Sequence, residues 1–413
     1  MRILFLTHYF FPEGNAPATR VHQLTRRWVA DGHEVTVITG VPNIPDGVVY
    51  DGYERRLLQR EEIDGVDVRR VWTYVAANKG TLLRIVNYVS FMLTATILGL
   101  FVKRPDVVIA TSPQFFCGWA GVFVSKLRRR PFVLEIRDLW PESIQAVGAI
   151  QNPLLIRCLE WLELRMYAAA DWVVTVGEGY RQKLLERGVP ADRISIIPNG
   201  VDLNTFSDRV GPGSFRDEFG LGDRFVCAYV GTLGMGSALH VVLRVARLLK
   251  QDGRDDIRLL LVGDGAIREE LEARARAEGL ECLVFSGRLD KRRIPEVLAA
   301  VDACLVHLRK TDLFKTVLPS KIFEACAMRR PIVLGVEGCA AELVEAAGAG
   351  ICIEPENEQQ LLDAVTRLAD DAELRKRLGD AGYEGIALHY DIDALGKTYT
   401  ELLEKLKGSG ANA

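Results

Sequence analysis

The chain has 413 residues, of which 48% are hydrophobic and 26% charged, and its formal net charge is −3. At roughly 100 to 200 residues per domain this length favours two domains, and the composition excludes intrinsic disorder and a disulfide mini-protein. The small negative charge argues against a nucleic-acid partner, which needs an excess of Lys and Arg. The eight cysteines have no metal-ligand spacing, which is typical of reduced thiols in a cytosolic protein.

Strand-like and helix-like segments alternate in the first half of the chain. The apolar run 3–6 follows Met1-Arg2 directly, so it predicts a strand and no secretory signal peptide. Further elements are expected, in chain order, over 19–31, 35–39, 66–72, 107–110, 117–127, 132–136, 152–169 and 172–176. Short β-rich runs separated by helices favour a parallel sheet covered on both faces.

Residues 82–102 are largely apolar and match the roughly 20 residues that a bilayer-spanning helix needs. The segment also contains Arg84, Asn87, Thr94 and other polar residues, which are costly in hydrocarbon. The polar residues favour a buried or membrane-surface helix, with a transmembrane helix as the alternative.

A second alternating series follows a strand at 194–197 and a linker at 198–222, which is rich in Asn, Gly, Pro, Asp and Ser. Its elements are expected over 225–230, 239–249, 258–262, 266–278, 284–286, 294–300, 303–306, 321–328 and 331–334. We therefore predict an α/β fold of two Rossmann-like βαβ domains facing across a cleft, with ligands at the carboxyl ends of the strands. The predicted domains are 1–200, 201–385, and a C-terminal helix in 386–413 that packs back on the first domain before a disordered tail.

Two loops in the first half carry candidate binding residues. Gly14 and Asn15 lie between the first strand and a helix start whose free N–H groups suit a phosphate or a sugar hydroxyl. A plain structural turn is the alternative, and the GxGxxG spacing of dinucleotide-binding loops is absent. Arg137 and Asp138 follow a strand, where charges are costly unless they are paired or bind something. They indicate either phosphate or sugar recognition or a bridge that caps the sheet.

The second half carries two glycine loops and one dense polar segment. Gly231-Thr232 and Gly263-Asp264-Gly265 each lie between a strand and a helix, which favours a nucleotide cleft. If a helix starts at Ser320, Lys321 and Glu324 share one face in its first turn. Glu324 there suits both hydroxyls of a ribose, while Lys321 and Lys315 suit a diphosphate. An exposed ion pair is the alternative.

The remaining motifs mainly exclude functions. His8 and His307 follow strands, but a lone histidine is more often a hydrogen-bonded structural group. The absence of HExxH, GxSxG and a Walker A loop excludes zinc protease, serine hydrolase and P-loop readings.

Taken together, the residues resemble the family 4 retaining glycosyltransferases of GT-B fold, and within them the WbuB-like branch of N-acetyl-L-fucosamine transferases. The matching segments are Pro12-Glu13-Gly14-Asn15-Ala16-Pro17, Gly32-His33-Glu34-Val35-Thr36-Val37, Thr111-Ser112-Pro113, Arg137-Asp138-Leu139-Trp140-Pro141-Glu142-Ser143, Ile197-Pro198-Asn199-Gly200-Val201-Asp202 with Phe206, Val262-Gly263-Asp264-Gly265, and Pro319-Ser320-Lys321-Ile322-Phe323-Glu324-Ala325. They extend over nearly the whole chain.

The resemblance implies a nucleotide, UDP, held by the C-terminal domain and an acceptor held by the N-terminal one. Glu324 would bind the ribose, Lys321 with Ser320 and the Gly14-Asn15 loop the diphosphate, and Arg288 the uracil side. It further implies that Gly231 and Thr232 form the phosphate-side loop, that Arg137, Asp138 and Lys321 serve catalysis, and that no metal or other cofactor is needed.

Two departures from the family pattern concern the donor. The position eight before Glu324 is Thr316 rather than the usual glutamate, and residues 233–237 contain no cation. Lys315, Lys321 or Arg137 are the candidates to substitute.

The resulting expectation is an enzyme that transfers an N-acetylated sugar from UDP to an undecaprenyl-diphosphate-linked saccharide in O-antigen or capsule synthesis. Its expected location is cytoplasmic and peripheral on the inner face of the plasma membrane, through residues 82–102 and the nearby cations Arg84, Lys103, Arg104 and 126–130. The alternatives are a UDP-sugar epimerase and a non-catalytic nucleotide-sugar-binding partner protein.

Overall fold

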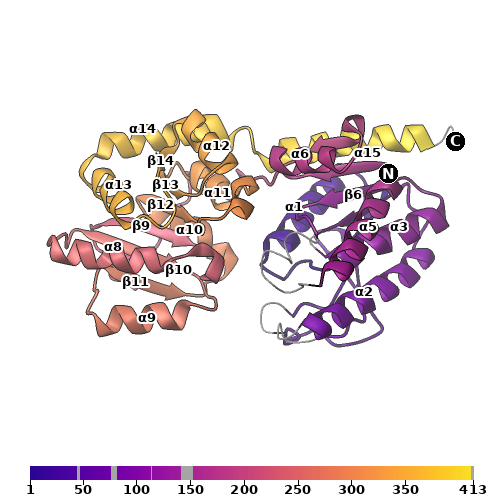
Figure 1. Ribbon diagram of the computed structural model, residues 1–413, viewed down its shortest axis with the longest axis horizontal. Helices are drawn as coiled ribbons and strands as arrows, with labels where there is room; N and C mark the ends of the chain where they lie inside the picture. The colour runs from indigo at the N-terminus through magenta and orange to yellow at the C-terminus, as the bar shows by residue number, and fades with distance from the viewer. Residues whose placement is uncertain (44–46, 76–80, 113, 141–151, 411–413) are drawn as a thin grey trace. The chain divides into compact units, whose positions relative to one another are not determined.

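The computed structural model describes residues 1–43, 47–75, 81–112, 114–140 and 152–410. Over these residues the chain divides into two compact units. Unit 1 comprises Met1–Asn199 and Ile392–Ala413, and unit 2 comprises Gly200–Asp391. Each unit is described by itself below, and both are drawn in Figure 1.

Unit 1 is built on a sheet that has eight strands within the described residues, in the order β3-β4-β2-β1-β5-β6-β7-β8. The strands are β1 (Arg2–Leu6), β2 (Glu34–Thr39), β3 (Leu58–Ile63), β4 (Val66–Val71), β5 (Val107–Thr111), β6 (Phe132–Ile136), β7 (Trp172–Thr175) and β8 (Ile194–Ile196). All of these are paired in parallel except β3, which is antiparallel to β4. A two-residue turn with positive φ at Asp64 and Gly65 joins that hairpin.

Helices cover both faces of this sheet. The described helices of unit 1 are α1 (Ala16–Ala30), α2 (Thr81–Phe101), α3 (Phe115–Arg128), α5 (Pro153–Ala169), α6 (Glu178–Glu186) and α15 (Ile392–Gly410). Buried side chains of α2, α3 and α5 share one core with alternate strand residues such as Leu4 and Leu134. Those of α1 and α15 share the other core with Phe5 and Val133. Alternation along parallel strands thus produces the two-faced sheet that the sequence predicts.

The last helix returns to unit 1. On α15, Tyr399 is fully buried and packs edge-to-face on Trp28 of α1, with ring centroids 5.2 Å apart. Asp393 of α15 pairs with Arg27 of α1. The change of unit lies between Asp391 and Ile392 rather than after residue 385, because Ile386 is buried in the core of unit 2. We expected a disordered tail from Gly408 onward, but the backbone of α15 stays helical to Gly410. Residues 411–413 lie outside the described residues.

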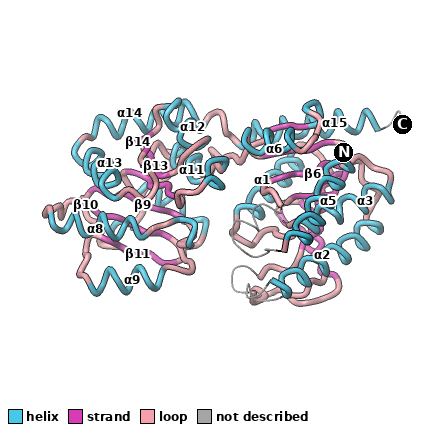
Figure 2. Tube along the Cα trace, in the orientation of Figure 1, coloured by secondary structure: helices cyan, strands magenta, loops and turns pink. Residues whose placement is uncertain are grey.

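Unit 2 has a six-stranded parallel sheet over its residues 200–391, in the order β11-β10-β9-β12-β13-β14. The strands are β9 (Phe225–Val230), β10 (Ile257–Val262), β11 (Leu283–Gly287), β12 (Ala303–His307), β13 (Ile332–Gly335) and β14 (Gly350–Cys352). The helices are α7 (Phe215–Glu218), α8 (His240–Gln251), α9 (Arg268–Ala277), α10 (Ile294–Ala300), α11 (Lys321–Ala327), α12 (Cys339–Ala347), α13 (Glu358–Asp370) and α14 (Ala372–Gly382). Figure 2 shows the alternation of helix and strand.

The helices of unit 2 also lie in two layers. Residues of α8, α9 and α13 share a core with one set of strand residues, and those of α10, α11 and α12 share a core with the alternate set. The predicted linker 198–222 is wrong in its second half, because Phe215 of the short helix α7 is fully buried in unit 2. The apolar side chains of this segment are scattered among turn-forming residues, so composition alone does not predict that the segment packs on unit 2.

Candidate functional site

The carboxyl ends of β9 and β10 bring the two glycine loops of unit 2 together. The Gly231 amide donates to the Val262 carbonyl over 2.8 Å, and the Leu233 amide donates to the Asp264 carbonyl over 2.9 Å. Gly231 and Gly263 have φ values of 144° and 134°, and a side chain on Gly263 would overlap the Gly231 carbonyl. Close approach of the two backbones therefore requires glycine at position 263, and the φ of Gly231 also favours glycine there.

Lys321 lies directly on the first glycine loop. It is the first residue of α11, and its Nζ is 3.6 Å from the centroid of the Tyr229 ring. A β-carbon on Gly231 would stand 2.5 Å from Lys321 Cε and 2.7 Å from Nζ. The cation is thus held at the end of β9 by an aromatic face and by the absence of a side chain on Gly231.

Glu324 shares the inward face of α11 with Lys321, as the helical spacing predicts. Both side chains border a small pocket whose floor is apolar and includes Ala228, Val230 and Val306. Burial raises the pKa of the Glu324 carboxyl, although Lys291 and Lys321 oppose the rise. Lys291 and Lys321 are thus near this half-buried carboxyl, so the predicted alternative of an exposed surface pair is wrong.

Lys291 is a member of this cluster that the sequence analysis missed. It opens the short helix Lys291–Arg293, which follows β11, and burial lowers its pKa while Glu324 raises it. Its position just past the carboxyl end of a parallel strand is the signal that would have found it.

The other predicted residues of unit 2 lie around this cluster with different partners. Lys315 is paired with Asp312 over 2.7 Å and is 3.9 Å from Glu337, so its charge is already compensated. Arg288 is exposed just after β11, and Thr232 is exposed in the first glycine loop. Ser320 is the N-cap residue of α11, but its hydroxyl makes no capping hydrogen bond.

Two other predicted positions have structural partners. His307 Nδ1 is 2.8 Å from the Ser237 carbonyl, and its Nε2 accepts from the Glu356 amide over 2.9 Å. Burial lowers its pKa, which keeps the ring neutral and makes it a buried connector, as expected for a lone histidine. Thr316, at the position of the missing glutamate, lies with its hydroxyl 3.4 Å from the Leu313 carbonyl.

In unit 1, the loop after β1 leads into a capped helix. The Asn15 side-chain oxygen accepts from the Ala18 amide over 2.9 Å, so this oxygen is engaged in capping α1. Gly14 is exposed, has no positive φ, and a β-carbon there would meet nothing within 4 Å. No packing or backbone constraint in the described residues accounts for glycine at position 14.

Arg137 follows β6 and stands beside a buried ion pair. Arg20 pairs with Glu135 over 3.3 Å, and both side chains are almost fully buried. Burial favours the neutral carboxyl, but Arg20 and then Arg137 hold the pKa of Glu135 below its usual value. Burial and the nearby Arg20 lower the pKa of Arg137 to about 10. Two guanidinium groups thus share one carboxylate at this edge of the sheet.

Two N–H-bearing nitrogens of the Arg137 guanidinium have no acceptor among the described residues. Its Nη2 donates to the Asn199 side-chain oxygen over 3.3 Å, whereas Nε and Nη1 are buried and have no hydrogen-bond partner in the structure as described. The backbone amides of Arg137 and Asp138 both donate to the Ser112 hydroxyl, over 2.7 and 3.2 Å. The alternative of an Arg137–Asp138 bridge does not supply these missing acceptors.

Asp138 and His8 complete the predicted residues of this unit. Burial, then Asp138, raises the pKa of Tyr180 on α6 to about 12, so Asp138 lies near that phenol. His8 is buried against Tyr9, Tyr88 and Phe91, and burial lowers its pKa to about 4. The remainder of the predicted motif after Trp140, residues 141–143, lies outside the described residues.

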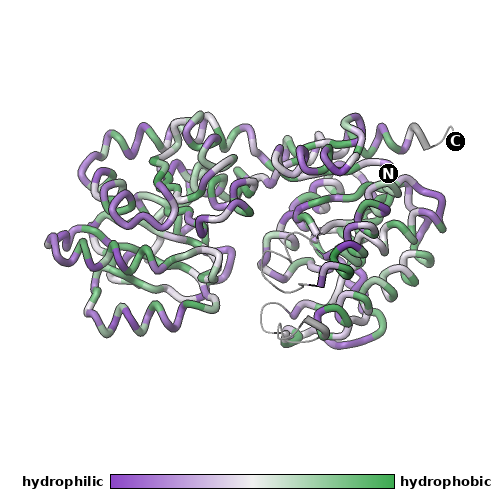
Figure 3. The backbone as a smooth tube through the Cα atoms, viewed as in Figure 1, coloured by the Kyte–Doolittle hydropathy of each residue, from purple (hydrophilic) through white to green (hydrophobic). Residues whose placement is uncertain are grey.

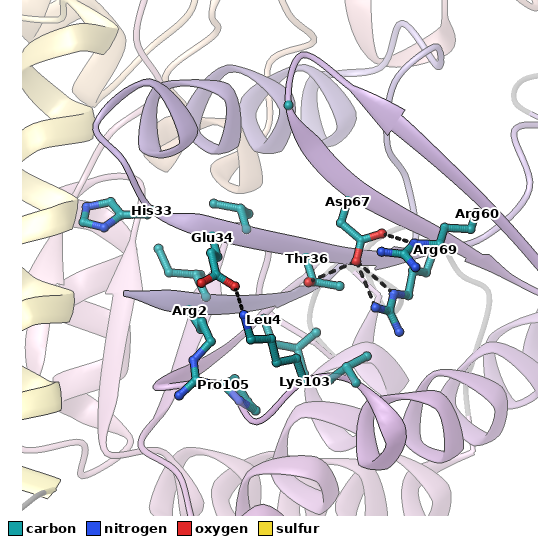
Figure 4. A pocket seen from close by; sticks show the side chains of 14 residues that line it. Arg2, Leu4, His33, Glu34, Thr36, Arg60, Asp67, Arg69, Lys103 and Pro105 are labelled. Atoms are coloured by element: carbon teal, nitrogen blue, oxygen red, sulfur yellow. Dashed lines mark hydrogen bonds and ion pairs between the residues drawn. The ribbon is translucent and has the colours of Figure 1, made fainter.

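A pocket at the opposite, amino end of the unit 1 sheet is a separate feature, shown in Figure 4. Its charged groups are paired with one another. Asp67 accepts from Arg60 over 2.7 Å and from Arg69 over 2.9 Å, and Lys103 donates to Glu34 over 2.5 Å. These pairs cover the part of the sheet beyond the end of α2, and they belong to the framework rather than to the strand ends that carry the site.

Two Rossmann-like units with candidate polar residues at their strand ends define a GT-B fold, and the solved structures of similar fold are glycosyltransferases. One is HepE from Anabaena in complex with UDP, with a TM-score of 0.71, 17% identity, and coverage of 98% of this chain and 100% of that one. Two family models also match, the glycosyl transferase 4-like domain over residues 15–200 and glycosyl transferases group 1 over residues 214–385. The chain belongs to this two-domain family of glycosyltransferases, which confirms the predicted fold class.

Two curated relatives show the range of the family. A putative colanic acid biosynthesis glycosyl transferase of Escherichia coli, WcaI, is 26% identical over 376 residues, covering 88% of this chain and 91% of the relative. An N-acetylgalactosamine-N,N'-diacetylbacillosaminyl-diphospho-undecaprenol 4-alpha-N-acetylgalactosaminyltransferase of Campylobacter jejuni is 23% identical over 272 residues, covering 66% and 68%. Neither relative singles out the WbuB-like branch.

Proposed function

We propose that the chain is a retaining, metal-independent glycosyltransferase that moves an N-acetylated sugar from UDP to an undecaprenyl-diphosphate-linked saccharide in bacterial O-antigen or capsule synthesis. The observation that carries the proposal is the placement of Lys321 and Glu324 on one face of α11, with Lys321 against the Gly231 loop. A cation beside a glycine loop and a carboxylate one helical turn away match the diphosphate and the ribose of a nucleotide sugar.

The nucleotide lies along the carboxyl ends of β9 to β12 in this proposal. The Glu324 carboxylate accepts hydrogen bonds from the two ribose hydroxyls, and Lys321 with the Gly231-Thr232 backbone holds the diphosphate. Ser320 at the start of α11 and Arg288 after β11 supply further donors, the latter on the uracil side. Lys291 is the second cation beside Glu324.

The chemistry is a front-face substitution. The bond between the anomeric carbon and the donor's phosphate oxygen breaks, and the acceptor hydroxyl oxygen forms the new bond on the same face. The acceptor proton passes to the departing phosphate oxygen, so UDP is released and no protein nucleophile is required. Lys321 and the loop amides stabilise the charge that develops on the diphosphate, and this electrostatic work is what a metal would otherwise supply.

The acceptor side belongs to unit 1 in this proposal. Arg137 has two buried donors without protein acceptors, and a phosphate or sugar oxygen would satisfy them. Asp138 orients a hydroxyl beside Tyr180. The exposed Gly14 backbone, with the amides at the start of α1, instead contacts the diphosphate of the donor. Lys315 is only a secondary candidate for binding the diphosphate, because Asp312 compensates its charge.

The proposed sugar and location rest on the family resemblance and on the name of one relative. N-acetylated donors fit the resemblance to the WbuB-like branch and the N-acetylgalactosaminyl transfer named for the Campylobacter relative, and N-acetyl-L-fucosamine is the first sugar to test. That relative's name also specifies an undecaprenol-linked acceptor, which supports a reaction at the cytoplasmic leaflet in this proposal. We accordingly propose a cytoplasmic enzyme in peripheral contact with the inner face of the plasma membrane.

Calorimetric titration with UDP, followed by a panel of UDP-sugars, tests the donor half of the proposal. Wild type should bind UDP at micromolar concentrations, and Glu324→Ala should lose at least about tenfold in affinity, because each hydrogen bond to a charged group contributes roughly 1.5 to 3 kcal/mol. Glu373→Ala, an exposed substitution on α14, is the matched control. Equal UDP affinity in wild type and Glu324→Ala would reject the site, and UDP binding without turnover on any lipid-linked acceptor would favour the non-catalytic alternative.

A further inference from the structure

The long apolar helix α2 turns its polar side chains toward the protein. The Asn87 side-chain amide donates to the Tyr74 carbonyl over 2.7 Å, and the Ser90 hydroxyl accepts from the Tyr74 amide over 2.9 Å. The Thr94 hydroxyl donates to the Trp72 carbonyl over 3.0 Å. These bonds tie the helix to the segment that leaves β4, and they engage three of its polar side chains within the protein.

The solvent-facing side of α2 is apolar. Val86, Leu93, Ile97 and Phe101 follow a helical spacing of seven, four and four residues, so they form one stripe. Ile97 is 60% exposed and Phe101 79% exposed. An ordinary surface helix places an apolar stripe toward the core and polar residues toward water, whereas α2 is also apolar along much of its exposed side.

The exposed apolar surface continues onto the two neighbouring helices. α3 contacts both α2 and α5, and the helices α2 and α3 approach closely where Gly99 meets Val124. Phe123 and Leu127 on α3 and Trp161 and Leu164 on α5 are exposed. Eleven of the twenty exposed large hydrophobic side chains of the described residues lie on these three helices, which is a concentration that scattered surface residues do not produce. Figure 3 shows the hydrophobic colour along α2 and α3.

Cations border this surface. The helices α2 and α3 contain no Asp or Glu. Arg104, Lys126 and Arg129, which lie just past α2 and toward the end of α3, are exposed and have no carboxylate partner within the described residues. Lys103 and Arg128 are excluded from this set, because Lys103 pairs with Glu34 and Arg128 donates to the Leu100 and Val102 carbonyls.

We propose that the outer face of α2, α3 and α5 is a membrane-binding surface, which lies in the plane of an anionic bilayer with its apolar stripe in the headgroup–acyl boundary. The apolar stripe matches the acyl boundary, and the unpaired cations match anionic headgroups. Two copies of this surface facing each other would oppose cation to cation, so charge favours lipid over self-association. The biological purpose of the surface rests on the proposed lipid-linked acceptor, whereas its binding to lipid does not.

The geometry distinguishes lying on the bilayer from crossing it. In the described part of the chain, one helix, Leu83–Phe101, is long and apolar enough to cross a membrane, and 22% of that segment is buried in the protein. Phe91 and Ala95 are fully buried in the core of unit 1, and Asn87, Ser90 and Thr94 are bonded to it. A helix attached along one side to its own sheet presents only the other side to lipid.

Vesicle flotation of the full chain tests the proposal. Wild type should float with vesicles that contain about one third phosphatidylglycerol and remain unbound with pure phosphatidylcholine. Ile97→Asn/Phe101→Asn should lower the partition coefficient at least about tenfold, because two large apolar side chains that would leave water on binding are replaced by polar ones. Leu57→Asn/Leu388→Asn removes two exposed apolar residues elsewhere and should bind as wild type.

A second measurement locates the contact and separates it from catalysis. Cys158 on α5 is the exposed one among the eight cysteines, all of which are described, so an environment-sensitive dye on it should shift to shorter wavelength with anionic vesicles. UDP titration without vesicles should be unchanged in Ile97→Asn/Phe101→Asn, so loss of lipid binding and loss of the donor site are read separately. Failure of wild type to float, equal floating of the paired variants, or vesicle-independent dimers that Ile97→Asn/Phe101→Asn dissociates would overturn the proposal.

Discussion

The end of the Lys321 side chain crowds the position that a β-carbon on residue 231 would take. A β-carbon on Gly231 would lie 2.7 Å from Nζ, closer than such atoms approach in proteins. The same Nζ lies 3.6 Å above the Tyr229 ring, in the strand that leads into the loop. The glycine, the aromatic ring and the lysine therefore act as one unit, which places a single positive charge at the end of β9.

Gly231→Ala should weaken UDP binding through this relationship. The new β-carbon would displace the flexible end of Lys321, and the φ of 144° adds backbone strain. We expect a loss in UDP affinity of at least about tenfold by calorimetry, since a charge-assisted contact contributes roughly 1.5 to 3 kcal/mol. Gly220→Ala is the control, because Gly220 also has a positive φ but no neighbour within 4 Å of its β-carbon. Equal effects of the two substitutions would show that strain alone is responsible.

Gly14→Ala should leave stability unchanged and raise the KM of the transfer reaction. Nothing in the described structure contacts the position of the new methyl group, and the backbone conformation is open to alanine. If a ligand approaches this backbone, a methyl group there excludes it. The expected result is an unchanged midpoint of thermal unfolding together with a raised KM, compared with Gly211→Ala, which is similarly unhindered in unit 2. Unchanged KM and kcat would remove Gly14 from the site.

Glu324 should couple UDP affinity and stability to pH in opposite senses. Burial raises the pKa of its carboxyl in the folded protein above the ordinary value of 4.5. The folded state therefore holds this proton more tightly than the unfolded state, so the contribution to stability falls as pH rises from below 4.5 through the raised pKa. UDP binding needs the ionised carboxylate, and it should strengthen as pH rises through the same range.

Glu324→Gln separates these two effects. The variant should unfold at a higher temperature than wild type at pH 7 to 8, and this advantage should disappear below about pH 4.5, where both states of wild type are protonated. Its UDP affinity should be low and without the pH dependence of wild type. Differential scanning fluorimetry and calorimetry across pH measure both quantities. If Glu324→Gln is less stable than wild type at pH 8, the attraction of Lys291 and Lys321 stabilises the ionised Glu324 carboxylate by more than its burial destabilises it.

The sequence predicted the buried elements better than the polar ones. The bounds expected for β9 agree with the structure, because a continuous apolar run with clear ends admits little choice. Those of α10 agree as well, since Pro295 in its first turn marks its start. β3 was missed because Leu58–Ile63 is mostly charged and polar, and its strand conformation depends on pairing with β4 at the sheet edge. Helices α12 and α13 were also missed, although both have ordinary apolar stripes.

The candidate site shows the same division. Lys321 and Glu324 were found because their relationship is local, set by one helical turn. Lys291 and the Arg20–Glu135 pair were not found, because they join residues far apart in the chain through the fold. The capping bond of Asn15 is local, but the sequence alone does not decide between capping and ligand binding for such a residue.

We expect Arg137 to lower the free energy of unfolding and to raise kcat/KM. Its Nε and Nη1 are buried without a partner in the described structure, and burial has lowered its pKa to about 10. Arg20 already compensates Glu135, so Arg137 is not needed for that carboxylate. Replacing a buried, incompletely bonded cation by an apolar side chain of similar length is usually neutral or stabilising. We expect Arg137→Met to unfold in denaturant at the same or a higher concentration than wild type.

The same variant should lose activity, because the missing acceptors would come from the substrate. With a lipid-linked acceptor, kcat/KM should fall by about a hundredfold, corresponding to roughly 2.7 kcal/mol of lost stabilisation. If the ligand is the acceptor's phosphate, KM for the acceptor rises and UDP affinity is unchanged. If the ligand is the leaving diphosphate, UDP affinity falls as well. Arg137→Lys should recover part of the activity, whereas a less stable Arg137→Met with normal turnover per folded molecule would make Arg137 a structural link to Asn199.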